Sequence, residues 1–467
     1  MLRFFSCLIC LSFFSCSQTQ KHETYFGGGI VHPKADHVIL FKDNKLIDSI
    51  KLDNKGHFHY KFELDEPGLF TFRHAYEPQT VFFNPGDSLR LRLNTMEFDA
   101  SLVFSGKGAV ENNFLIENYL LNQKNTDLIF SYYKIEPNEF ESKTDSIRLF
   151  REKKLEVLSK KHKLSEEFIK IAQKSIDFEF YDMRERYAFL LNKYNPEKAK
   201  NISDVFFDYR KNIDFNDEDV IYLFGYQRFL DNYLKNRSIK ICQQKNNYSD
   251  CYNLSSHSNL DDRISLVDSI IKIEHLRKNY FERFIKEEII YAQTPENLKH
   301  TEQLINKFNF SDKEKSSLNS LIDFQSAMLV NADLKDVMVK CTSMKEHRLA
   351  DIMDKEKGIV YSWTVQSPSH HKLRIKKINS LKKKYPDVKF IGINIDYNFP
   401  DKWLDAVNKY NHNFNNEYII EPEEHAAFYR NFLNKIFFID ENCIIQKSEI
   451  IIRNNDLEKH VQEFIEI

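Results

Sequence analysis

The spacing of apolar residues changes twice along this chain of 467 residues, and these changes constrain its fold more than any single motif. Residues 24–105 alternate apolar and polar side chains between turn sequences such as KDNK and DNKG, as β-strands do. Residues 112–325 place apolar side chains three and four positions apart, as packed helices do. Residues 330–467 alternate short apolar segments with helical ones. The pattern therefore predicts strands, then helices, then mixed structure.

These changes predict a multidomain protein. Its length favours three domains, at about 150 residues per domain. We expect an N-terminal antiparallel β domain over residues 24–110, most simply a sandwich, and a central all-α region over residues 111–325. An α/β domain is expected over residues 330–467. Within the central region, Ser165 followed by two glutamates marks the start of a helix.

The composition excludes several classes of protein. There are 67 Lys and Arg residues against 69 Asp and Glu, and the formal charge of -2 gives no general attraction to nucleic acid. The 40 Phe and 23 Tyr residues can bury large rings, which argues against wholesale disorder. With only 11 Gly and 11 Pro, the chain is neither collagen-like nor of low complexity.

The N-terminus has the pattern of an export signal. Residues 1–16 contain a basic Arg3, an apolar stretch too short to span a bilayer, and a small Ser15 before Cys16. This resembles a bacterial lipoprotein signal that is cleaved before Cys16, with acyl chains added to that residue. An ordinary secretory signal with an incidental cysteine is the alternative. We therefore expect a lipid-anchored protein on the periplasmic side of a bacterial membrane. The anchor could lie in either leaflet.

Export changes what the remaining cysteines mean, because the periplasm favours disulfides. Cys242 and Cys251 bracket a short polar loop and are either bridged or two unpaired thiols. Cys341 and Cys443 are isolated in the sequence, and we expect Cys443 to be exposed in a turn. Cys7 and Cys10 have the CxxC spacing inside the predicted signal, but no CxxC motif occurs after it, so the sequence signatures of zinc ribbons and dithiol redox sites are both missing from the predicted mature chain.

The last region follows a definite order of elements. Buried-type strands are predicted at residues 358–363, 388–396, 417–420, 436–440 and 444–451. Helices are predicted at residues 367–385, 403–410, 423–433 and 456–465. This order, βαβ, then α, then ββα, predicts a mixed sheet with helices on both faces.

Two stretches in this region carry a family resemblance. GIVYSWTVQSPSHHKLRIKKINSLKKKYPDVKFIGINID and FLNKIFFIDENCII resemble the membrane-tethered TlpA/ResA-like thiol–disulfide oxidoreductases, which have a thioredoxin fold with an inserted helix. Trp363 matches the family's strand-end Trp, and residues 391–396 match its second strand. The resemblance covers residues 330–467. Residues 24–120 are similar to the β domain that precedes such modules, through NPGDSL and FSGKGAVENN.

The family's chemistry is not matched at the corresponding positions. The resemblance implies cysteines at positions 367 and 370 and a cis-proline at position 434, where this chain has Ser367, His370 and Asn434. The family needs a thiolate at a helix N-terminus and a second cysteine one turn later, which resolves the mixed disulfide. A hydroxyl cannot form a disulfide, and a non-proline cis bond costs about 2.5–4 kcal/mol, so we expect a trans bond. We therefore expect no catalytic residues at these positions.

Each residue at this helix start has a structural alternative. Ser367 suits an N-cap with Pro368 in the first helical position, although a hydroxyl could also hold a substrate thiolate. His370 and His371 are either exposed polar residues or ligands and acid–base groups. A zinc site would need further ligands that the spacing does not supply, so we predict no metal and no cofactor.

The helix that follows is rich in basic residues. They form either a solvated face or a patch for an acidic partner or anionic headgroups. The residues are Lys372, Arg374, Lys376, Lys377, Lys382, Lys383 and Lys384.

Three functional hypotheses follow. The first is a redox-inactive thioredoxin-like module that binds a partner or has a structural role in the cell envelope, with no role in nucleic acid binding. The second is a thiol–disulfide or peroxide-reducing enzyme that uses Cys341, Cys443 or the pair Cys242 and Cys251. The third is an envelope glycan-binding lipoprotein whose aromatic residues on the β domain recognise the sugar, although the sequence does not separate such residues from the core.

Overall fold

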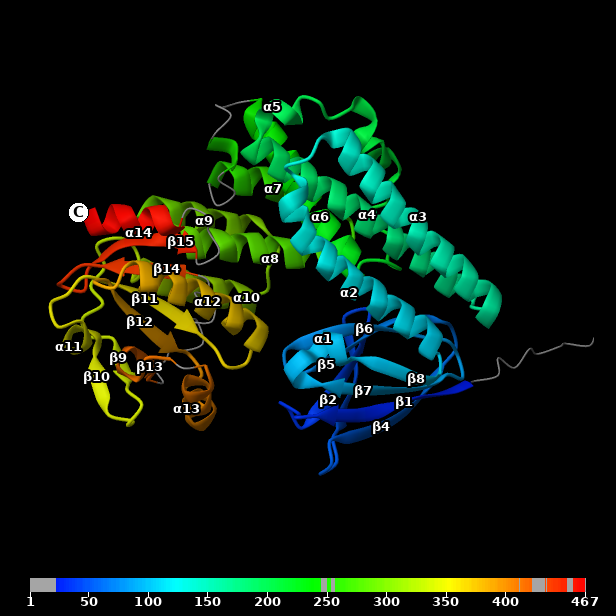
Figure 1. Ribbon diagram of the computed structural model, residues 1–467, viewed down its shortest axis with the longest axis horizontal. Helices are drawn as coiled ribbons and strands as arrows, with labels where there is room; N and C mark the ends of the chain where they lie inside the picture. Colours follow the sequence, from blue (N-terminus) through cyan, green and yellow to red (C-terminus); the bar gives the residue numbers. More distant parts are fainter. Residues whose placement is uncertain are drawn as a thin grey trace, which may run out of the picture. The chain divides into compact units, whose positions relative to one another are not determined.

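The computed structural model describes residues 22–244, 250–252, 257–410, 412–421, 433, 435–451 and 457–466 (Figure 1). The predicted signal peptide with Cys16 lies outside these residues, as does Asn434. The helix predicted over residues 423–433 also lies outside them, apart from residue 433. Among the described residues, no helix is long and apolar enough to cross a membrane.

The chain divides into two compact units, which we describe separately. The first comprises residues 1–213 and 217–231, and the second comprises residues 214–216 and 232–467. The division falls within helix α6 (Phe224–Gln243). The domain boundaries proposed above from the sequence stay predictions.

The first unit begins with eight strands in two four-stranded sheets, ordered β4-β1-β7-β8 and β3-β2-β5-β6. The strands are β1 (His22–Val31), β2 (His37–Lys42), β3 (Lys45–Lys51), β4 (His57–Leu64), β5 (Gly68–His74), β6 (Glu77–Phe83), β7 (Ser88–Asn94) and β8 (Val103–Lys107). Phe26 of one sheet contacts Phe72 and Phe83 of the other, with ring centroids 5.8 and 5.3 Å apart. The two sheets therefore share one core, as in a sandwich.

One pairing departs from the predicted antiparallel domain, because β1 and β7 run parallel. The chain passes through β5 and β6 of the other sheet before β7 joins the side of β1 opposite β4. β7 therefore runs in the same direction as β1. The other pairings within these two sheets are antiparallel.

In the first unit, two short helices lie between β7 and β8, and the other helices follow β8. The helices are η1 (Thr95–Glu97), α1 (Phe98–Ser101), α2 (Ala109–Tyr132), α3 (Pro137–His162), α4 (Glu166–Tyr194), α5 (Pro196–Ala199), η2 (Asp204–Asn212) and the start of α6. Ser165 caps α4 as predicted, because its hydroxyl accepts a hydrogen bond from the Phe168 N–H at 3.3 Å. The apolar stripe of α4, from Phe168 to Tyr187, is buried.

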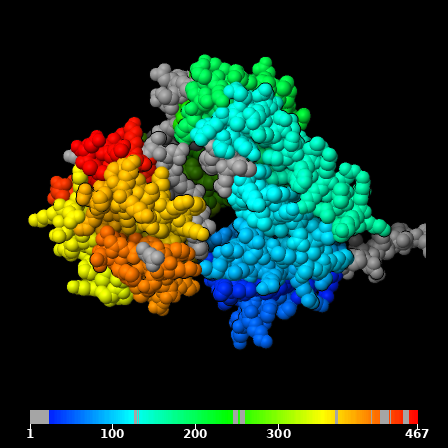
Figure 2. Space-filling model, in the orientation of Figure 1, coloured from blue at the N-terminus to red at the C-terminus, as the bar shows by residue number. Residues whose placement is uncertain are grey.

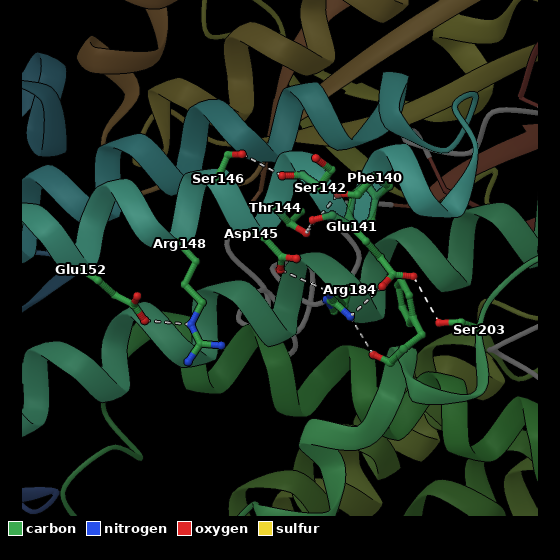
Figure 3. A network of polar contacts seen from close by, with 11 residues as sticks. Phe140, Glu141, Ser142, Thr144, Asp145, Ser146, Arg148, Glu152, Arg184 and Ser203 are labelled. Carbon is green, nitrogen blue, oxygen red and sulfur yellow. Dashed lines mark hydrogen bonds and ion pairs between the residues drawn. The ribbon is translucent and has the colours of Figure 1, made fainter.

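Charged side chains also join α3 to α4 (Figure 3). Arg184 of α4 donates to Asp145 of α3 at 3.2 Å and to the Phe206 carbonyl at 3.1 Å. Its guanidinium lies over the Phe180 ring, with 4.6 Å between the Cζ atom and the ring centroid. Glu141 of α3 accepts a hydrogen bond from the Ser203 hydroxyl at 3.3 Å. Arg184 is buried but Asp145 is 61% exposed, so this pair contributes little to stability and mainly orients the two helices.

The second unit begins with the rest of α6 and further helices. These are η3 (Asp250–Tyr252), α7 (His257–Ile270), α8 (Glu274–Tyr291), α9 (Pro295–Lys307) and α10 (Asp312–Ser326). Both α9 and α10 start with a complete capping box, at Thr294 and Ser311 respectively. The fully buried Lys435 ammonium of β14 donates to the Ile290 carbonyl of α8 at 2.5 Å. This contact ties the helices to the sheet that follows them.

The sheet of the second unit has seven strands in the order β10-β9-β13-β12-β11-β14-β15. They are β9 (Met338–Lys340), β10 (Glu346–Arg348), β11 (Gly358–Trp363), β12 (Lys389–Asn394), β13 (Glu417–Ile420), β14 (Lys435–Ile439) and β15 (Ile445–Ile451). The accompanying helices are α11 (Leu349–Met353), α12 (Pro368–Lys384), α13 (Pro400–Lys409), η4 (Phe414–Asn416) and α14 (Leu457–Glu466). Strands β11, β12 and β13 are parallel to one another, and β14 is antiparallel to both β11 and β15. The predicted strands over residues 358–363 and 417–420 are confirmed.

Candidate functional site

The start of α12 is the position at which the resembling family carries out its chemistry. β11 leads through a short loop to Ser367, the N-cap residue, and Pro368 occupies the first helical position as predicted. The Ser367 carbonyl accepts the His371 N–H at 2.9 Å. Among the described residues, the half-buried Ser367 side chain makes no capping hydrogen bond. The His370 side chain and Asn434 lie outside the described parts of the chain.

The loop before α12 is held by a buried carboxylate. Asp396, just after β12, accepts hydrogen bonds from the Thr364 hydroxyl at 2.8 Å, the Val365 N–H at 2.6 Å and the Gln366 amide at 2.8 Å. Asp396 is only 3% exposed. Three consecutive residues are therefore fixed between the strand and the helix. The sequence placed Asp396 at the end of a strand but gave no sign of this role.

Below the helix start, three flat side chains lie against one another. The Trp363 ring stacks on His412 and lies tilted by 30° against His371, with centroids 4.9 and 4.5 Å away. The two imidazoles are nearly parallel, and their Nε2 atoms lie 3.2 Å apart. Tyr410 meets His371 edge-on at 4.8 Å. This arrangement contradicts an exposed His371, because only 2% of that residue is exposed.

A buried glutamate anchors this stack. Glu417 of β13 accepts hydrogen bonds from the Tyr361 hydroxyl at 2.7 Å, the Trp363 indole at 2.8 Å and His412 Nδ1 at 2.9 Å. With that proton on Nδ1, His412 Nε2 accepts a hydrogen bond from His371 Nε2. His371 Nδ1 is then an acceptor, and it has no partner within the described chain. The result is a continuous path of hydrogen bonds from Glu417 to His371.

The electrostatics follow from burial. Burial, and then the electrostatic effect of His412 and Arg374, lowers the pKa of His371 to about 3, so this imidazole is neutral. Burial and the Glu417 charge raise the pKa of Tyr361 well above its ordinary value. Burial also lowers the pKa of Lys382, against the opposing effect of Glu417. The Glu417 carboxylate is therefore buried and surrounded by hydrogen-bond donors.

The predicted basic patch is smaller than expected. Arg374 is buried, and the half-buried Lys382 lies over the Tyr361 ring, with its Nζ atom 5.6 Å from the centroid. Both residues lie on the side of α12 that faces the sheet, so neither contributes to a surface patch. The other five residues stay at the surface, exposed or half-buried: Lys372, Lys376, Lys377, Lys383 and Lys384.

The described cysteines lie far from Ser367 in the sequence and have different surroundings. Cys242 and Cys251 form a disulfide with 5.6 Å between their Cα atoms. Cys443, expected to be exposed, is only 2% exposed, because the chain before β9 covers its turn and the Leu334 N–H donates to its carbonyl at 3.0 Å. Its φ of 63° suits the glycine that the family has there. Burial, with the charges of Asp333 and Asp440, raises the pKa of its thiol.

Cys341 differs from Cys443 in both its exposure and the direction of its pKa shift. It follows β9 and is partly exposed. Burial alone would raise the pKa of Cys341. Hydrogen bonds from Ser343, the His347 side chain and the Lys345 backbone outweigh this effect and lower the pKa to about 7. Its Sγ atom lies 3.1 Å from the Ser343 hydroxyl.

No group of three or more His, Cys, Asp or Glu side chains in the described residues is arranged to hold a metal ion.

The strand order of the second unit and the helix after β11 agree with the thioredoxin-like fold expected from the sequence. Solved structures of this class resemble the chain. The thioredoxin domain of a thiol-disulfide oxidoreductase from Bacteroides vulgatus is 15% identical, with a TM-score of 0.24, and the match covers 29% of this chain and 97% of that one. For a thioredoxin-like protein from Bacteroides caccae, the values are 10% identity, a TM-score of 0.31, and coverage of 60% and 94%.

A SCO1/SenC family lipoprotein from Bacillus anthracis is similar at 14% identity and a TM-score of 0.24, over 29% of this chain and 96% of that one. No family model matches the sequence, and no curated protein matches it. At these TM-scores the similarities carry no argument about this chain. The agreement of the second unit with the expected thioredoxin-like fold rests on its sheet topology.

Proposed function

We propose that this is an exported lipoprotein, anchored through Cys16, whose TlpA/ResA-like module no longer exchanges disulfides and acts as a binding or structural module in the cell envelope. Its layout would be a β domain, a helical region and the thioredoxin-like domain, as the sequence predicts. An envelope protein is the expected class of partner. No nucleic acid binding is expected from a chain with a formal charge of -2.

One observation carries this proposal. The N-cap of α12, where a dithiol enzyme needs its attacking thiolate, is the hydroxyl residue Ser367. Neither free thiol, Cys341 or Cys443, belongs to this helix start. Beneath it, the path from Glu417 ends on His371, and no hydrogen bond in the described chain connects it to the Ser367 hydroxyl. An unactivated alcohol at this position supports a binding role over chemistry.

The test is reduction of insulin by the purified mature protein with dithiothreitol. We expect no rate above background. The variant Ser367→Cys with His370→Cys serves as a positive control, because it restores two thiols at the start of the same helix. A wild-type rate above background that is lost on Cys341→Ser would overturn the proposal.

The second candidate is a peroxide-reducing or thiol-exchange enzyme based on Cys341. The observation that favours it is a partly exposed thiol whose pKa lies at about 7, so a large fraction would be thiolate at neutral pH. Its test is trapping of a sulfenic acid after addition of hydrogen peroxide. Labelling that is lost in Cys341→Ser and retained in Cys443→Ser, together with repeated consumption of peroxide when a dithiol reductant is supplied to return the sulfenic acid to the thiol, would favour this enzyme.

Anchoring has its own test. Substitution Cys16→Ser should leave an unprocessed precursor and abolish labelling with a radioactive fatty acid, since this cysteine would carry the acyl chains. Processing that continues unchanged in Cys16→Ser would indicate an ordinary secretory signal.

A further inference from the structure

The first unit, which includes the sandwich coloured blue in Figure 2, contains a groove made of two adjoining cavities. Two cavities of about 590 and 580 Å³ adjoin each other and share Asp43, Leu69 and Tyr222 in their walls. Each has the volume of a site for a small organic ligand. Together they can accommodate a ligand longer than one cavity.

Aromatic side chains line the second cavity. Tyr76 lies in the turn between β5 and β6 and is 60% exposed. Tyr119 of α2 and Phe224 of α6 pack edge-to-face against each other with centroids 4.8 Å apart. The face of a sugar ring presents C–H groups that pack on such rings, and aromatic side chains supply large contact areas with few rotatable bonds.

Hydrogen-bonding groups lie among these rings. Asp99 accepts hydrogen bonds from the Tyr119 hydroxyl at 3.1 Å and the Gln79 amide at 3.3 Å, which fixes its orientation. Burial, and then the charge of Asp99, raises the pKa of Glu77. Acceptors held in this way suit hydroxyl groups, each of which donates one hydrogen bond.

The edge of β6 in this groove is closed to a peptide strand. Pro78 has no N–H, and the Thr80 N–H already donates to the Gln79 side chain at 2.9 Å. Asn112 accepts from the Phe82 N–H at 2.7 Å and donates to the Phe82 carbonyl at 2.8 Å. Strand addition requires free backbone groups at an edge, so a ligand here must be recognised by side chains.

We propose that this groove binds an oligosaccharide without acidic substituents. Asp43, Glu77 and Asp99 line the second cavity against a single cation, Arg73, whose guanidinium lies over the Phe41 ring. This excess of carboxylates disfavours polyanionic glycans. The inference rests on the proposed binding role and names its ligand class. It does not depend on whether the second unit exchanges disulfides.

The test uses the whole mature protein on a glycan array that carries neutral, amino-substituted and acidic oligosaccharides, together with an immobilised hexalysine peptide. We expect the protein to bind neutral or amino-substituted glycans. In Tyr76→Ala the affinity should be about tenfold weaker, which corresponds to about 1.4 kcal/mol of binding free energy. Glu77→Gln should also weaken binding. The matched control is Phe150→Ala, which removes a ring that is 63% exposed on α3, outside the groove.

Unchanged far-UV circular dichroism in Tyr76→Ala would confirm that the variant folds. The inference is overturned if the protein binds no neutral or amino-substituted glycan, or if it binds only acidic glycans or hexalysine. It is also overturned if Tyr76→Ala binds the glycans as well as the wild type does. The insulin assay is independent of this result, so failure of the glycan test and failure of the proposed loss of redox chemistry can be told apart.

Discussion

His371 makes the stability of the second unit depend on pH. Burial, and then the electrostatic effect of His412 and Arg374, lowers its pKa to about 3, whereas the unfolded chain titrates near its ordinary value of about 6.5. Between these values only the unfolded state takes up the proton. The contribution of His371 is therefore fully present above about pH 6.5 and is lost as the pH falls toward 3.

We expect His371→Phe, which keeps a ring against Trp363, to reduce this dependence. Between pH 6.5 and 5, the free energy of unfolding of the wild type should fall by about 1–2 kcal/mol more than that of the variant, measured by urea unfolding. Glu417 and His412 face the same cluster and stay in both proteins, so the difference isolates His371. The exposed His162→Phe is the control, and equal losses in wild type and His371→Phe would contradict this account.

At the scale of elements, the pairing of β12 with β13 requires a close approach between Gly392 and Glu417. Gly392 is paired with Glu417 in the sheet register, and a Cβ atom at Gly392 would lie 2.2 Å from Glu417 Oε2. Since this carboxylate is fixed by three donors, it cannot move without losing hydrogen bonds. We expect Gly392→Ala to lower the free energy of unfolding by about 2–4 kcal/mol and to raise the exposure of Trp363.

Gly68→Ala is the control for that substitution, because its Cβ would meet only the far end of Lys42 at 3.9 Å. A loss in Gly392→Ala no greater than in Gly68→Ala would show that Glu417 is not held in place. The free energy of unfolding of both variants is measured by denaturant unfolding at neutral pH.

Local pattern was enough to predict these elements but not their shared contacts. The strand at residues 358–363, the helix after Ser367 and the strand at residues 417–420 follow from periodicity and capping. His371 and His412, however, are 41 residues apart in the sequence, and only the sheet order brings them together. The fold also places Arg374 and Lys382 on the side of α12 that faces the sheet. Some residues of any basic stretch on a packed helix lie on its inner face, so they do not join a surface patch.

At the scale of the whole molecule, the two units can be followed separately. The chain has two tryptophans, and both Trp363 and Trp403 are fully buried in the second unit. The Cys242–Cys251 disulfide belongs to the same unit. Tryptophan fluorescence therefore reports the unfolding of the second unit, whereas far-UV circular dichroism reports both.

Reduction of the disulfide should therefore affect one probe more than the other. Its cysteines are 9 residues apart, and a closed loop of that length restricts the unfolded chain by about 2–3 kcal/mol. We expect a reductant to shift the urea midpoint seen by tryptophan fluorescence to lower concentration, while part of the circular dichroism transition does not move. Cys242→Ser with Cys251→Ser should behave like the reduced wild type without any reductant, and Cys341→Ser should not. An equal shift of the whole circular dichroism transition would mean that the two units unfold as one.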